Sequence, residues 1–90
     1  MHRDELLIAV SARTGLSHKA AEEVLDTILA TIMDAVRDGD KVSLSGFGSF
    51  LLAERPARDG RNPRTGERIS IPARKVPRFI PGTQFRKAAQ

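Results

Sequence analysis

The sequence contains no cysteine, no tryptophan and no tyrosine, and its only imidazoles are those of His2 and His18. Disulfide bonds and cysteine-based metal sites are therefore excluded. His2 lies at the chain terminus and His18 at the start of a predicted helix, so we interpret both as surface residues and expect no metal site. The absence of cysteine is consistent with a reducing compartment, and we expect a cytoplasmic protein.

The sequence also lacks a long apolar run. A membrane-spanning helix needs ~20 consecutive apolar residues, and no stretch here approaches that length. The first ten residues, MHRDELLIAV, place two acidic residues ahead of a short apolar stretch, unlike a signal peptide. We therefore expect a soluble protein that has no membrane partner.

Catalytic motifs are missing as well. Serine, histidine and aspartate residues are scattered, and no motif brings a nucleophile beside a base. The sequence predicts a protein that is not an enzyme and that takes no cofactor and no small-molecule substrate.

Positive charge, by contrast, is concentrated in one segment. The whole chain of 90 residues has a formal net charge of +4. Residues 53–76 contain seven basic side chains against three acidic ones, and the remaining residues contain eight of each sign. All the net charge therefore lies on about a quarter of the chain, which indicates a projecting basic arm rather than a uniformly basic surface.

Two helices are predicted before this arm. The first runs from Arg3 to Arg13, with acidic residues in its first turn, and ends at Gly15. Ser17 is the expected N-cap of the second helix, which ends at Gly39. Its apolar residues recur with helical spacing: Ala21, Val24, Leu25, Ile28, Leu29, Ile32, Met33 and Val36.

After Gly39 the apolar period changes to two, which predicts a strand over residues 42–44 and, beyond the turn at 46–48, a second strand over 49–55. The second strand passes into the arm, and a returning third strand ends before Pro81. Prolines 56, 72 and 77 lack an N–H and suit only edge strands, as a two-stranded ribbon provides. A short helix over 83–89 completes an α+β order within one domain.

Ninety residues with an arm of this size leave a small body, for which we expect only about 60% of the surface to be buried. Without disulfides or metal, dimerisation is the remaining source of stability. The predicted core of the body and of the dimer interface contains Val24, Leu25, Ile28, Leu29, Ile32, Leu44, Phe47, Phe50 and Phe79.

Four motifs, TGLS at 14–17, GFGSF at 46–50, GRNPRTGE at 60–67 and IPARKVPRFIPG at 71–82, resemble those of the bacterial HU and integration host factor family, and HU most closely. The resemblance covers the chain from end to end. It implies an intertwined dimer, with a dimerisation body of residues 1–52 and 77–90 and a DNA-binding β-ribbon arm of residues 53–76. It also implies that the two arms embrace duplex DNA and that the proline at each tip enters the minor groove, wedges between base pairs and bends the duplex.

Carried over residue by residue, the resemblance makes Pro63 the intercalating wedge. It places the other DNA contacts at Arg3, Arg55, Arg58, Arg61, Asn62, Arg64, Thr65, Arg74 and Lys75. Ile80 and Thr83 stand where many relatives carry lysine, so contacts with phosphates beside the body are expected to be fewer. Arg86 and Lys87 are candidates to replace them.

The chemistry of these residues supports DNA binding independently. Arginine offers a fixed fork of donors and a permanent charge, which suits phosphates and a narrow minor groove. The arm has one asparagine and no glutamine to read base edges, so sequence preference should be weak. The predicted function is an architectural protein that binds and bends double-stranded DNA and compacts the nucleoid.

Other interpretations stay open at the level of sequence. Pro63 could serve only as a turn former, and a site-selective protein like integration host factor is the nearest alternative. The first two helices could form a helix-turn-helix, although the second exposes acidic rather than basic residues. The ribbon could instead clasp an acidic protein. A homodimer is expected, and a heterodimer with a paralogue is also compatible with the sequence.

Overall fold

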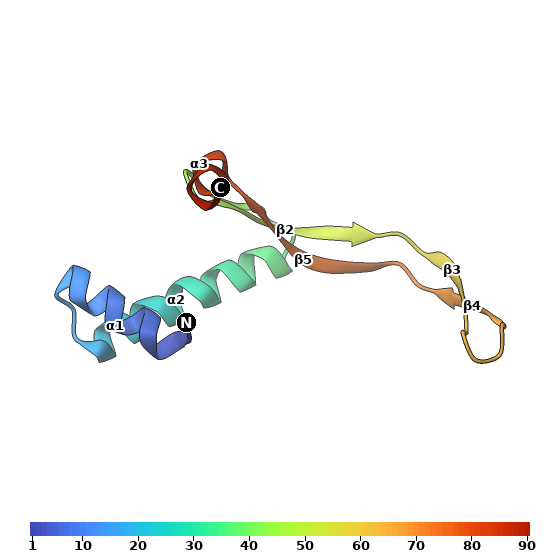
Figure 1. Cartoon of the computed structure of the whole chain (residues 1–90), viewed down its shortest axis with the longest axis horizontal. Coiled ribbons are helices and arrows are strands. Elements are labelled where there is room, and N and C mark those ends of the chain that lie inside the picture. Colours follow the sequence, from blue (N-terminus) through green and yellow to red (C-terminus); the bar gives the residue numbers. More distant parts are fainter. The chain divides into compact units, whose positions relative to one another are not determined.

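The computed structural model describes all residues from 1 to 90, and the chain forms two compact units, Met1–Asp34 and Ala35–Gln90. No helix has both the length and the apolar character needed to cross a membrane. Figure 1 shows the order of elements along the chain: α1 (Arg3–Thr14), α2 (His18–Arg37), β1 (Val42–Leu44), β2 (Gly48–Arg55), β3 (Arg58–Arg61), β4 (Arg68–Ile71), β5 (Arg74–Pro81) and α3 (Thr83–Ala89). The predicted α+β class is confirmed.

The first unit contains α1 and most of α2. α1 ends where Gly15 adopts a left-handed conformation, with φ of 77°, and its N–H donates to the Ser11 carbonyl at 3.0 Å. α2 begins after Ser17, whose Oγ accepts the Ala20 N–H at 3.1 Å. Leu7 and Ala21 are completely or almost completely buried in this unit. The predicted helices, and the glycine and serine at their boundaries, are therefore confirmed.

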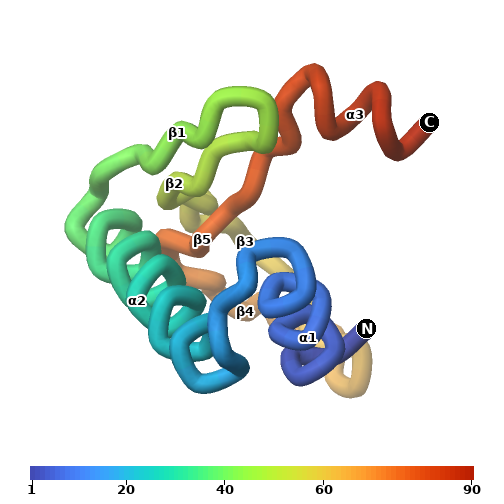
Figure 2. The backbone as a smooth tube through the Cα atoms, turned by 90° about the vertical axis from the view of Figure 1, so that its left-hand side faces the viewer, coloured from blue at the N-terminus to red at the C-terminus, as the bar shows by residue number.

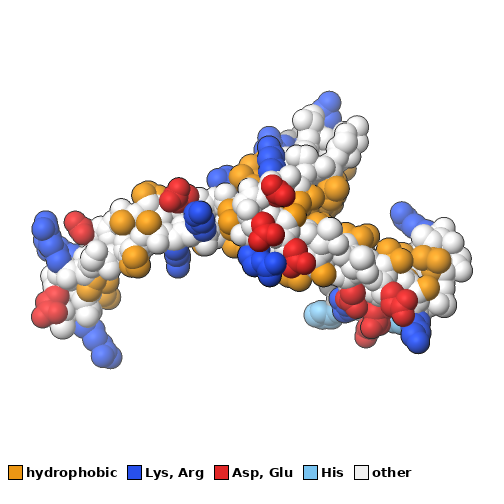
Figure 3. All heavy atoms as spheres, turned by 180° about the vertical axis from the view of Figure 1, so that it is seen from behind, with side chains coloured by type: hydrophobic (Ala, Val, Ile, Leu, Met, Phe, Trp, Pro, Cys, Tyr) orange, Lys and Arg blue, Asp and Glu red, His pale blue; other side chains and the backbone are white.

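The apolar stripe of α2 is largely uncovered within a single chain. Val24, Ile28, Leu29 and Met33 are between 42% and 65% exposed, and Figure 3 shows apolar atoms on the molecular surface. Leu25 and Ile32 are half-buried. Leaving such a stripe exposed to water is unfavourable, because burial of apolar surface stabilises a protein by about 25 cal/mol per Å².

The second unit is built on an antiparallel sheet of order β1-β2-β5. β1 and β2 are joined by a tight turn over residues 45–47, in which the Phe47 N–H donates to the Leu44 carbonyl at 3.0 Å. The turn begins one residue earlier than predicted, because Gly48 already pairs with Leu44 as the first residue of β2. β2 is the central strand and β5 an edge strand, which is why Pro77 is accommodated in β5 opposite Leu52.

Four phenylalanines gather where this sheet meets α3. Phe50 and Phe79 are cross-strand partners with ring centroids 4.8 Å apart, and Phe47 lies 5.3 Å from both Phe79 and Phe85. The Gly82 N–H donates to the Phe47 carbonyl at 2.8 Å and so holds the start of α3 against the β1–β2 turn, as Figure 2 shows. Leu44 and Phe47 nevertheless stay 42% and 44% exposed.

The arm extends β2 and β5 away from this sheet as a two-stranded ribbon (Figure 1). The sequence predicts one continuous ribbon, whereas the structure divides it into two paired segments. Pairing of β2 with β5 ends at Arg55 and Arg74, and pairing of β3 with β4 starts at Arg58 and Ile71. Each strand has a proline at the break, Pro56 or Pro72, which cannot donate a ladder hydrogen bond.

Candidate nucleic-acid interface

The arm exposes nearly all of its basic side chains. Figure 3 shows Lys and Arg side chains standing out from the ribbon on opposite sides, with fewer acidic side chains among them. No ion pair joins an arm arginine to a carboxylate of the chain. The guanidinium groups are therefore available to an external anion. The predicted contacts exposed in this way are Arg55, Arg58, Arg61, Arg64, Arg74 and Lys75.

Strand register places like charges opposite one another at two points of the arm. Arg55 faces Arg74 at the end of the first ribbon segment, and Arg61 faces Arg68 at the end of the second. Like charges directly opposite destabilise a sheet by up to about 1 kcal/mol per pair. An anion bound between them removes this repulsion, so the arrangement favours a polyanionic ligand.

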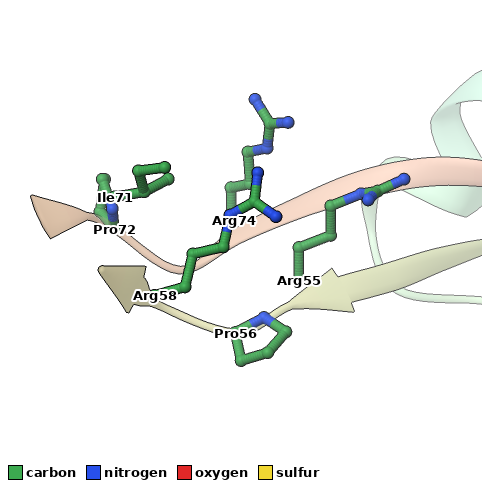
Figure 4. Close-up of a pocket in the computed structure, with 6 residues that line it drawn as sticks. All are labelled: Arg55, Pro56, Arg58, Ile71, Pro72 and Arg74. Atoms are coloured by element: carbon green, nitrogen blue, oxygen red, sulfur yellow. The ribbon is translucent and has the colours of Figure 1, made fainter. Parts of the chain in front are cut away.

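The break between the two ribbon segments forms a shallow pocket of about 170 Å³. It is lined by Arg55, Pro56, Arg58, Ile71, Pro72 and Arg74. In Figure 4 the three guanidinium groups rise above the strand that carries Arg55 and Arg58, whereas the ring of Pro56 hangs below it. Register places Arg55 of one strand and Arg74 of the other directly opposite each other, so these two arginines share one face of the ribbon.

The arm tip is a loop closed by Asn62. The Asn62 N–H donates to the Glu67 carbonyl at 2.8 Å, and the Asn62 carbonyl accepts the Gly66 N–H at 2.7 Å. Gly66 has a φ of 72°, a conformation that favours glycine. Pro63 is exposed within the loop that these bonds close.

Below the tip, two isoleucines of β4, Ile69 and Ile71, lie on the face of the ribbon that also carries Gly60. A Cβ added to Gly60 would lie 3.3 Å from Ile71 and 3.5 Å from Ile69, so both isoleucines cover the glycine backbone. Ile69 is 44% exposed. The spacing of two residues between Ile69 and Ile71 is the signal in the sequence for this shared face.

Arg3, the predicted contact outside the arm, has an intramolecular partner. Its guanidinium donates to the carboxylate of Asp26, which joins α1 to α2. Both side chains are about half exposed. Sequence reasoning missed this pair, because 23 positions separate the two residues and no local spacing signals the contact.

Ile80 and Thr83, the two residues that depart from the family resemblance, lie at the junction of β5 and α3. Ile80 is half-buried at the end of β5, and Thr83 is exposed at the start of α3. Arg86 and Lys87 occupy the last turn of α3 and are exposed.

Comparisons with known proteins agree along the whole chain. The family model described as "Bacterial DNA-binding protein" matches residues 1–90. DNA-binding protein HU 1 of Bacillus subtilis is 50% identical, over 98% of this chain and 96% of its own length. DNA-binding protein HU of Geobacillus stearothermophilus is 49% identical over the full length of both chains.

Solved structures give the same result. The chain superposes on the HU–DNA cocrystal structure of Anabaena with a TM-score of 0.92 and 48% identity, covering 99% of this chain and 97% of the other. HU from Thermotoga maritima superposes with a TM-score of 0.72 and 30% identity, covering all of both chains.

Proposed function

Because this chain belongs to the family of bacterial DNA-binding proteins that includes HU, we propose that it is an architectural protein that binds duplex DNA with low sequence specificity and bends it. The observation that carries the proposal is the arm: a ribbon with exposed, unpaired arginines that ends in an exposed proline. In this proposal residues 53–76 form the DNA-binding arm, and residues 1–52 and 77–90 form the dimerisation body.

The arginines supply affinity through phosphates and the negative potential of the minor groove. Each phosphate neutralised releases condensed counterions, so log K falls with log salt by about 0.9 per phosphate on B-DNA. Arg55 and Arg74 offer two guanidinium groups to one stretch of backbone. Because the minor groove presents a degenerate pattern, such contacts discriminate weakly between sequences.

Pro63 supplies the bend in this mechanism. Its ring is apolar and compact, and it carries no N–H that would be left without a partner between stacked bases. Unstacking one step costs roughly a few kcal/mol, which is offset by the additional arm contacts that a bent duplex allows. Arg61, Asn62, Arg64 and Thr65 lie beside the ring at the tip.

A second copy of the chain is the proposed partner in the body. Val24, Ile28 and Leu29 are 42% to 49% exposed in the single chain, and a partner that covers them removes this apolar surface from water. A homodimer satisfies the requirement with one gene product. The same faces would also serve a heterodimer with a paralogue.

The family assignment also bears on the remaining alternatives. Site-selective binding like that of integration host factor is not favoured, because the relatives from Bacillus and Geobacillus are named HU and the arm offers a single side-chain amide, that of Asn62. We further propose that the protein is not an enzyme and that it acts in the cytoplasm on the nucleoid. The exposed acidic residues of α2 speak against the recognition helix of a repressor.

Bending of a short duplex labelled at both ends tests the function, measured by energy transfer at two salt concentrations. The wild-type protein should shorten the end-to-end distance, and binding should weaken as salt rises. Pro63→Ala should reduce the bend angle more than the affinity at low salt, because the arginine contacts remain. Equal bending by wild-type and Pro63→Ala would overturn the wedge, and a duplex left straight by the wild-type protein would overturn the function itself.

A further inference from the structure

We infer that Asn62 is a positioning residue, whose side-chain oxygen fixes the turn that presents Pro63 before DNA arrives. The inference rests on the proposed function, because the turn matters for insertion of the ring. It narrows the role expected for Asn62 from a residue that touches DNA to one that acts through its neighbour.

The backbone hydrogen bonds of Asn62 close the loop but do not fix the orientation of Pro63 at its apex. They connect Asn62 to Glu67 and Gly66, on the far limb of the loop. Pro63 cannot contribute a further bond as donor, since it has no N–H. The orientation of the proline therefore depends on an interaction within the near limb.

The Asn62 side chain supplies that interaction. Its Oδ1 accepts the Arg64 N–H at 2.9 Å, so a hydrogen-bonded turn encloses Pro63. The Arg64 backbone N–H can only donate, so the side-chain atom of Asn62 in this contact must be its oxygen rather than its nitrogen.

The burial of the tip residues distinguishes Asn62, which stabilises the turn, from Pro63, which the turn exposes. Asn62 is half-buried, whereas Pro63 and both neighbouring arginines, Arg61 and Arg64, are exposed. An asparagine whose purpose was to reach a base edge would extend its amide into solvent. The Asn62 side chain instead turns toward the backbone N–H of Arg64.

Holding the turn in advance favours binding, because a loop that is already ordered loses less conformational entropy when the ring enters the stack. A typical hydrogen bond of this kind contributes enough to change an equilibrium about fivefold. Asn62→Ala should therefore weaken binding to a linear duplex about fivefold for each inserted arm. It should also lower the bend angle.

The acceptor, rather than the amide group, is the feature to test. Asn62→Ser keeps an oxygen that can accept the Arg64 N–H but has no amide nitrogen, and Asn62→Asp keeps the oxygen geometry more closely. Thr65→Ala is the matched control for the measurement without DNA only, since it removes the side-chain acceptor of the Glu67 N–H, at 3.3 Å on the opposite limb.

The experiment consists of two measurements on the full-length protein. Without DNA, exchange of the Arg64 amide with water is measured by NMR: it should accelerate severalfold in Asn62→Ala and stay slow in Asn62→Asp and Thr65→Ala. With DNA, end-to-end energy transfer should show reduced bending by Asn62→Ala and recovery of most of the bend by Asn62→Ser.

Failure of the inference can be told apart from failure of the function. If the wild-type protein bends DNA but Asn62→Ser bends it as poorly as Asn62→Ala, the amide contacts DNA and the positioning role is wrong. Unchanged Arg64 exchange in Asn62→Ala also overturns the role, whatever the DNA result. A wild-type protein that leaves the duplex straight overturns the proposed function.

Discussion

Gly48 shows how one residue sets the geometry of the body. A Cβ at this position would lie 2.6 Å from both the Ile80 carbonyl oxygen and the Phe79 ring. The backbone of β2 therefore approaches β5 and the aromatic cluster more closely than any side chain permits. The GFGSF motif reflects this packing requirement in addition to a turn.

We expect Gly48→Ala to destabilise the protein by about 1–3 kcal/mol, the usual effect of overpacking a filled interior. The measurement is urea unfolding at a fixed protein concentration. Gly15→Ala is the comparison, because its Cβ would meet nothing within 4 Å and only the left-handed backbone, at about 1–2 kcal/mol, opposes it. A Gly48→Ala variant as stable as the wild-type protein would contradict the close approach.

Arg3 illustrates a residue whose proposed role depends on its partner. Asp26 holds the Arg3 guanidinium, and an exposed pair of this kind contributes only about 0–1 kcal/mol to stability. Asp26→Asn should therefore leave the unfolding midpoint nearly unchanged. By releasing Arg3 for phosphate, it should strengthen binding to duplexes long enough to reach the body.

Glu23→Gln is the matched control for this prediction, since it removes one negative charge from α2 at a residue that makes no ion pair with Arg3. Binding to short and long duplexes is compared by titration at one salt concentration. Equal strengthening by Asp26→Asn and Glu23→Gln would mean that net charge, rather than a freed Arg3, is responsible.

At the scale of elements, local patterns predict most of the fold. The 3.6-residue stripe of α2, the helix end at Gly15 and the period-two strands β1 and β2 all correspond to residues whose conformation is decided by near neighbours. The break in the ribbon is not predictable from either proline alone. Only strand register brings the Pro56 and Pro72 gaps opposite one another.

The candidate site is predictable to the same extent. The sequence identifies the arm, its basic residues and the proline at its tip, since all of these are local. It does not predict the facing pairs Arg55–Arg74 and Arg61–Arg68, which depend on register, or the turn bond from Asn62 to Arg64. These features depend on strand pairing and loop closure. No regular spacing of residues in a single sequence indicates them.

Each arginine of the arm that contacts a phosphate should make a measurable contribution to the salt dependence of DNA binding. Arg61→Ala should weaken binding to all duplex sequences alike and lower the slope of log K against log salt by about 0.9 for each phosphate that the wild-type side chain neutralises. Arg13→Ala, an exposed arginine in the last turn of α1, is the control and should leave the slope unchanged. A slope that Arg61→Ala does not alter would place this residue away from phosphate.

At the scale of the whole molecule, the chain leaves much of its predicted apolar core uncovered. Leu7, Ala21 and Val36 are its only buried hydrophobic residues, whereas much of the predicted core is exposed. Because the body is small and has no disulfide or metal site, we expect the predicted core residues to lie at a dimer interface. In the proposed dimer, a second copy of the chain would cover the exposed side chains Val24, Ile28, Leu29, Leu44 and Phe47.

If folding and association are coupled, the melting temperature should rise with protein concentration, because dimer formation draws the equilibrium towards the folded state. Ile28→Asp should remove most of this dependence by placing a charge in the apolar stripe. Thr31→Asp adds the same charge on the polar face and should preserve it. Sedimentation at micromolar concentration gives the decisive reading: a monomeric mass for the wild-type protein would contradict the dimer, and with it the idea that two arms grip one duplex.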